Sequence, residues 1–96
     1  MKEKPANVLL LVLDSVRAKN CSMHGHPEPT TPFLDQFAAE RATFYANAKA
    51  PGARSLTSHV SMFSRLDVAQ HGVVSPSDKL DAGYNVFDRL RKAGYT

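Results

Sequence analysis

The sequence predicts an α/β fold, and three of its features favour this class. Residues 8–13 are six consecutive apolar residues, a pattern typical of a strand that is covered on both faces in a parallel sheet. Helical patterns follow, first over residues 32–42 and last over residues 86–93. Because the last helix returns the chain toward the sheet, these elements indicate a sheet with connecting helices.

The first half of the chain contains one predicted strand and one predicted helix. The strand covers residues 7–13, and residues 15–31 form a loop rich in turn-forming residues. Thr31 suits the N-cap of a helix and Pro32 its first position, so we expect a helix from Pro32 to Arg41 or Ala42.

The second half of the chain is predicted to alternate loops with short elements. Residues 43–47 have strand character, and the last helix has Asn85 as a possible N-cap and Gly94 as a C′ residue. The other expected segments are a loop over residues 50–54, a helix over residues 58–64 and a loop over residues 66–80.

The end of the sequence indicates an incomplete domain. Tyr95 and Thr96 resemble the first step of a new strand, and the first strand still lacks a partner in its sheet. We therefore expect residues 1–96 to be the amino-terminal part of an α/β domain. An independent small α/β fold is the alternative.

Composition excludes several classes of function. The 96 residues carry a formal charge of +3 and are 43% apolar, which is ordinary for one small globular domain. The twelve Lys and Arg residues form no run and no basic stripe, so we expect no nucleic-acid partner. No stretch approaches the ~20 apolar residues of a membrane-spanning helix, so we expect no membrane partner.

Cysteine content and the start of the chain bear on location. The single cysteine, Cys21, can form no internal disulfide, which fits a reducing compartment. We expect no signal peptide, because the apolar run is too short and no small-residue cleavage site follows it. The expected location is cytoplasmic.

Asp14 is the first candidate site residue. It comes directly after the apolar run, and open parallel sheets bind ligands at the carboxyl ends of their strands. A carboxylate at that edge is a suitable ligand for a hard cation. Alternatively, Asp14 only caps the turn or helix that follows.

Residues 55–59 are the second candidate segment, with three hydroxyls and an imidazole before a predicted helix. An anionic ester can dock at a helix N-terminus, where a Ser or Thr oxygen would be the nucleophile. A cation held by Asp14 would screen the ester, His59 would donate to an ester oxygen, and Arg54 would add charge-assisted contacts. The alternative is that these hydroxyls are helix caps. The remaining histidines, which we assign to loops, are His24, His26 and His71.

Taken together, these segments resemble the amino-terminal part of the sulfatase family, within the alkaline phosphatase superfamily. The similar stretches, in order, are residues 7–17, 30–35, 50–51, 55–63, 70–73 and 90–96. The resemblance implies a large α/β sandwich around a mostly parallel sheet. It also implies hydrolysis of sulfate esters, usually with one bound calcium ion and a formylglycine nucleophile made from Cys or Ser.

The resemblance assigns roles residue by residue. Asp14 matches the first metal aspartate, and Ser55 matches the nucleophile, which also contacts the metal. Three positions depart from the family pattern: Ser15 stands where a second metal aspartate is frequent, Thr57 replaces Pro or Ala, and His59 replaces Arg. Because the Pro and Arg are missing, we expect Ser55 to act as an unmodified alcohol.

The sequence therefore predicts a sulfatase-like hydrolase whose catalytic residues are Ser55 and His59 and whose metal ligands are Asp14 and Ser55, with Ca²⁺ as the expected ion. The expected substrate is a small-molecule or glycan ester of sulfate or phosphate. The first alternative is a metal-dependent phosphoesterase or phosphotransferase of the same superfamily. The second is a non-catalytic remnant or small binding module. We expect residues 1–96 alone to be inactive.

Overall fold

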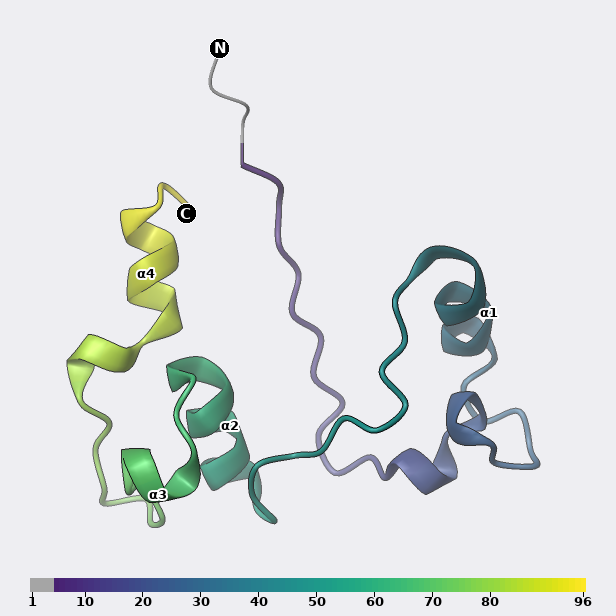
Figure 1. The fold of residues 1–96 in the computed structure, drawn as a ribbon, viewed down its shortest axis with the longest axis horizontal. Coiled ribbons are helices and arrows are strands. Elements are labelled where there is room, and N and C mark those ends of the chain that lie inside the picture. Colours follow the sequence, from purple (N-terminus) through teal and green to yellow (C-terminus); the bar gives the residue numbers. More distant parts are fainter. Residues whose placement is uncertain (1–4) are drawn as a thin grey trace. The chain divides into compact units, whose positions relative to one another are not determined.

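The computed structural model describes residues 5–96, apart from the side chain of Ala82, and divides the chain into two compact units. One unit contains residues 5–12 together with residues 50–96, and the other contains residues 13–49. Figure 1 follows the chain through both units. The charged start of the chain, residues 1–4, lies outside the described residues.

The unit of residues 13–49 is built around one α-helix. Two short 3₁₀ helices, η1 (Ala18–Asn20) and η2 (Ser22–His24), precede α1 (Pro32–Arg41), and η2 packs against α1. A side-chain hydrogen bond joins η2 to the start of α1, because the Thr31 N–H donates to Ser22 Oγ at 3.0 Å. Within α1 and its N-cap, Thr31 Oγ1 donates to Asp35 Oδ1 at 2.9 Å. The helix predicted from Pro32 to Arg41 is confirmed.

The other unit contains the remaining helices, drawn from green to yellow in Figure 1. They are α2 (Ser55–Ser64), α3 (Val68–His71), η3 (Ala82–Tyr84) and α4 (Val86–Lys92). Helix α2 is central, because it packs against both α3 and α4. Phe63 of α2 meets Phe87 of α4 with ring centroids 5.0 Å apart, a tilted arrangement that aromatic pairs favour.

Local capping signals explain where these short helices begin and end. Asn85 Oδ1 accepts the N–H of Phe87 at 2.9 Å, as predicted for an N-cap. Gly94 has a φ of 92°, which is the left-handed conformation expected of a C′ glycine. Helix α3 begins with a capping box in which the Asp67 N–H donates to Gln70 Oε1 at 2.9 Å.

The predicted strands are not formed within residues 5–96. Residues 8–13 follow an extended course but remain exposed, with Leu9 at 90% exposure, and residues 43–47 are irregular. A strand requires backbone hydrogen bonds from a neighbouring segment, and no described residue supplies them to residues 8–12. The apolar pattern therefore correctly identifies an extended segment, whereas the strand and the parallel sheet are not formed by the described part of the chain.

Two further predictions need correction. The helix expected to begin at Ser58 begins at Ser55, and the loop expected over residues 66–80 contains α3. The capping pair of Asp67 and Gln70 is the signal that identifies α3 in the sequence.

Burial concentrates on α2 rather than on a large apolar core. Among the described side chains, the buried apolar residues are Cys21 and Val73, whereas Thr57, Ser61 and Ser64 of α2 are buried polar residues. Each of these hydroxyls is hydrogen bonded, as burial requires. Helix α2 is therefore held in its unit largely by polar contacts.

His71 joins α2 to α3. Its Nδ1 accepts the N–H of Val73 at 2.9 Å, so in the neutral ring Nε2 carries the proton and donates to Ser61 Oγ at 3.0 Å. The prediction that His71 is a loop residue is wrong, because it is the last residue of α3. None of the helices within residues 5–96 has the length and apolar character needed to cross a bilayer.

Candidate functional site

The N-terminal end of α2 carries the predicted nucleophile. Ser55 is the first residue of this ten-residue helix and is exposed. Arg54 precedes it as the N-cap in an extended conformation, and its carbonyl accepts the N–H of Ser58 at 3.1 Å. The helix dipole and the N–H groups of the first turn make this end suitable for an anion.

The neighbouring hydroxyls are used to attach the preceding loop to the helix. Thr57 Oγ1 donates to the Arg54 carbonyl at 3.0 Å, and Ser58 Oγ donates to the Gly52 carbonyl at 2.7 Å. Gly52 approaches so closely that a Cβ atom there would lie 2.3 Å from Thr57 Oγ1. Thr57 and Ser58 therefore have structural roles, and Ser55 is the hydroxyl at the first position of the helix.

His59 lies one helical turn after Ser55. Its Nδ1 is 2.7 Å from the Ser55 carbonyl, which can only accept, so Nδ1 carries a proton and donates it. The ring also meets Phe63, with centroids 5.9 Å apart. Since Nδ1 is engaged, Nε2 is the nitrogen that can serve a ligand: it donates in the imidazolium form and accepts in the neutral form.

The Arg54 side chain forms a hydrogen bond within its own unit. Its Nη2 donates to the Val74 carbonyl, which anchors the start of α2 to the turn at residues 74–78. The Asp78 carboxylate closes this turn by accepting the N–H groups of Val74 at 3.0 Å and Ser75 at 2.8 Å. These two backbone hydrogen bonds, that of Val74 first, lower the pKa of Asp78 because they stabilise its charged form.

Asp14 belongs to the other unit. It is exposed in a turn after the extended segment, and the next residue, Ser15, has a φ of 61°. A shared cation between Asp14 and Ser55 remains a prediction.

The described residues test the fit of a metal only in part. A carboxylate and a hydroxyl are oxygen donors of the type that Ca²⁺ prefers, but the ion takes six to eight such ligands. Within residues 5–96, no group of three or more His, Cys, Asp or Glu side chains gathers in a metal-binding arrangement. The donor chemistry fits, whereas a full ligand set is not formed by the described residues.

Comparison with known proteins identifies the family of this chain. A family model described as Sulfatase matches residues 6–96, nearly the whole chain. The chain belongs to the sulfatase family. The predicted resemblance is thereby confirmed for this sulfatase-family chain. No curated protein and no solved structure matches it.

His24, His26 and Gly52 are the remaining residues for which the sequence-based expectation can be compared with the structure. The ring of His24 packs on Phe44 with centroids 5.0 Å apart, and His26 Nδ1 accepts the N–H of Glu28 at 3.1 Å. The first contact joins residues twenty positions apart within the unit of residues 13–49, and the second is local. The close approach of Gly52 to Thr57 was not predicted, because a Pro-Gly pair signals a turn without identifying the side chain that packs against it.

Proposed function

We propose that this sulfatase-family chain contributes the nucleophile of a hydrolase that cleaves sulfate esters. One observation carries the proposal: Ser55 is an exposed hydroxyl at the first position of a ten-residue helix, in a chain matched by the Sulfatase model. The fold that goes with this proposal is the α/β sandwich with a mostly parallel sheet, and the location is cytoplasmic.

The helix end explains how the ester would be held and attacked. The N–H groups of the first turn and the helix dipole would orient the anionic ester oxygens. Ser55 Oγ would attack sulfur and release its proton to solvent water, and the bond from sulfur to the leaving-group oxygen would break as that oxygen takes a proton from solvent water. His59 in its imidazolium form would donate from Nε2 to an ester oxygen, because Nδ1 is engaged by the Ser55 carbonyl. Water would then release the sulfate from Ser55.

Asp14 and Ser55 are the residues proposed to hold a divalent cation, with Ca²⁺ as the expected ion. When bound, such a cation screens the charge of the ester and favours ionisation of a coordinated hydroxyl. Calorimetry with Ca²⁺ tests this part directly, because the chain should release or absorb heat at millimolar metal and an Asp14→Asn variant should do so less. Absence of heat from the unaltered chain would favour a non-catalytic binding module.

A phosphoesterase or phosphotransferase of the same superfamily is the second candidate. It is favoured by Thr57 and His59, which replace the residues of the formylglycine motif and leave Ser55 as an alcohol. The substrate in either case is a small-molecule or glycan ester. Parallel assays with an aryl sulfate and an aryl phosphate separate the two candidates, and mass spectrometry of the Ser55 peptide shows whether the side chain is modified.

The decisive variant is Ser55→Ala. It should abolish turnover in the complete enzyme and leave the helical signal in circular dichroism unchanged, because the exposed hydroxyl contributes little to packing. Ser77→Ala is a matched control, since the Ser77 hydroxyl contacts only Ser75 Oγ, at 2.9 Å, among the described residues. Unchanged activity in Ser55→Ala would remove Ser55 from the mechanism.

A further inference from the structure

The carboxyl end of α2 lines a pocket that is separate from the Ser55 end of the helix. Its volume is about 210 Å³, and it is lined by the end of α2 and by residues 83–89. Ser55 and Arg65 are ten residues apart, which is about 15 Å along a helix, so an ester group at Ser55 does not reach this pocket. The inference below is therefore independent of the proposed function.

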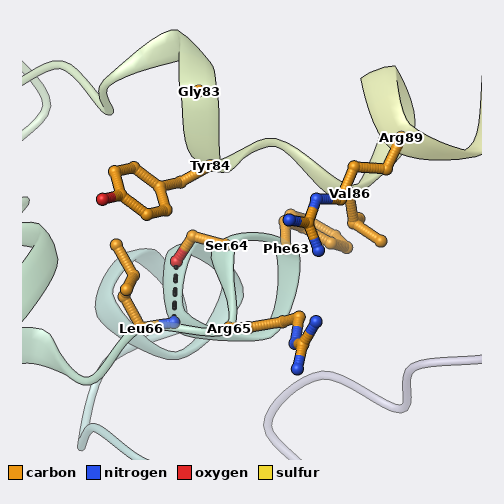
Figure 2. Close-up of a pocket in the computed structure, with 8 residues that line it drawn as sticks. All are labelled: Phe63, Ser64, Arg65, Leu66, Gly83, Tyr84, Val86 and Arg89. Atoms are coloured by element: carbon orange, nitrogen blue, oxygen red, sulfur yellow. Dashed lines mark hydrogen bonds between the residues drawn. The ribbon is translucent and has the colours of Figure 1, made fainter. Parts of the chain in front are cut away.

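Two arginines at the pocket lack an anionic partner among residues 5–96. Arg65 and Arg89 both line it, and neither guanidinium forms an ion pair or a side-chain hydrogen bond with any residue between 5 and 96. The acidic residues nearest to them in the sequence are engaged: Asp67 in the capping box of α3, and Asp88 with Arg91 at 2.8 Å. In Figure 2 the two arginine side chains lie at one end of the pocket.

Apolar groups form the other wall. Figure 2 shows the Tyr84 ring and the Leu66 side chain at the end opposite the arginines, whereas Phe63 and Val86 lie on the side of the arginines. The floor is closed by the buried Ser64, whose hydroxyl accepts the N–H of Leu66 at 3.2 Å. A pocket with one cationic end and one apolar wall suits a ligand that is itself divided into an anionic and an apolar part.

The charges of this site outweigh the helix dipole. The carboxyl end of a helix carries about half a negative charge, which by itself disfavours an anion, whereas the two guanidinium groups carry one positive charge each. Planar guanidinium groups also bind oxyanions with paired hydrogen bonds.

We propose that this pocket binds an organic oxyanion, a molecule with a sulfate or phosphate group on an aromatic or aliphatic body. The charged group lies between Arg65 and Arg89. The apolar body packs against Leu66 and Tyr84. The affinity is millimolar, because the pocket is small and both arginines are exposed to solvent.

The test is an NMR titration of the ¹⁵N-labelled 96-residue chain with phenyl sulfate, and with inorganic sulfate and benzyl alcohol as partial ligands. Phenyl sulfate should shift the amide signals of Leu66, Tyr84 and Val86, with tighter binding than either partial ligand. Equal affinity for inorganic sulfate would overturn the apolar part of the proposal. Absence of shifts at millimolar phenyl sulfate would overturn all of it.

Variants identify the residues responsible. Arg65→Gly and Arg89→Gln should each weaken binding by roughly fivefold or more, because each removes one charge-assisted contact. Arg65→Gly keeps the fold, since Arg65 has a left-handed φ of 64° that glycine adopts without strain. Lys92→Gln removes one positive charge from the same α4 helix outside the pocket and should change affinity by less than about twofold. Equal losses in Lys92→Gln and Arg89→Gln would show general charge attraction and contradict the site.

Discussion

The two ends of α2 are built by different means. At the N-terminal end, two bonds lie within one short segment, from Thr57 to the Arg54 carbonyl and from Ser58 to the Gly52 carbonyl, and one bond from Arg54 reaches the distant Val74 carbonyl. At the carboxyl end, the surroundings of Arg65 come from residues 83–89, about twenty positions later. A single helix can thus present a site built mainly from neighbouring residues at one end and a site made by tertiary packing at the other.

Gly52→Ala should disrupt the N-terminal end of α2 and cause the largest loss of stability among these variants. The new Cβ would lie 2.3 Å from Thr57 Oγ1 and 2.9 Å from Thr57 Cβ, so the loop or the helix must move. Overpacking of this kind costs about 1–3 kcal/mol, which thermal unfolding followed by circular dichroism should detect as a lower midpoint.

Gly83→Ala is the control for that experiment. A Cβ at Gly83 would meet Asp81 Oδ1 at 3.6 Å, an ordinary contact, and Gly83 does not have a positive φ. This variant should unfold near the temperature of the unaltered chain. A midpoint in Gly52→Ala as high as in Gly83→Ala would show that the approach of Gly52 to Thr57 is not tight.

A comparison of Arg65→Gly with Arg65→Ala should separate the effect of the backbone conformation on stability from the effect of the side chain at the carboxyl end of α2. Arg65 adopts a φ of 64°, a conformation that is strained for a residue with a Cβ atom. Arg65→Ala removes the guanidinium and keeps this strain, whereas Arg65→Gly removes both. The glycine variant should be about 0.5–1 kcal/mol more stable than the alanine variant in urea unfolding. If the alanine variant is the more stable one, the left-handed cap at Arg65 does not hold in solution.

Lowering the pH should produce the smallest effect, limited to the turn that anchors Arg54. The backbone N–H groups of Val74 and Ser75 lower the pKa of Asp78, so the stabilisation is present above about pH 3.9, the ordinary value for Asp, and is lost as the pH falls through the lowered pKa. The amide signals of Val74 and Ser75 should titrate with a midpoint below about 3.9. Asp78→Asn should lack this step, and a midpoint at or above the ordinary value would contradict the hydrogen bonds.

Helix boundaries were predictable where the signal is local. Thr31–Pro32 and Asn85 identify the starts of α1 and α4, since a cap depends on side chains within a few residues of the helix end. Helix α3 was missed although its capping pair, Asp67 and Gln70, is visible in the sequence. Residues 8–13 show the opposite case, because an apolar pattern identifies a segment that can form a strand but does not supply its partner.

The candidate site also has some features that the sequence predicts and others that only the structure reveals. The hydroxyl of Ser55 and the imidazole of His59 follow from their order in the sequence, and so does membership of the sulfatase family. The engagement of His59 Nδ1 by the Ser55 carbonyl required the helix to begin three residues earlier than predicted.

By itself, the sequence determined the family, the position of Ser55 before or within a helix, and the ends of α1 and α4, because these depend on residue types and short-range order. Tertiary structure alone decided that His71 holds Ser61, that Val74 engages Arg54, and that two arginines share a pocket with Tyr84. These contacts join residues ten to twenty-four positions apart in the chain, and spacing along a sequence does not specify which distant side chains meet when helices pack.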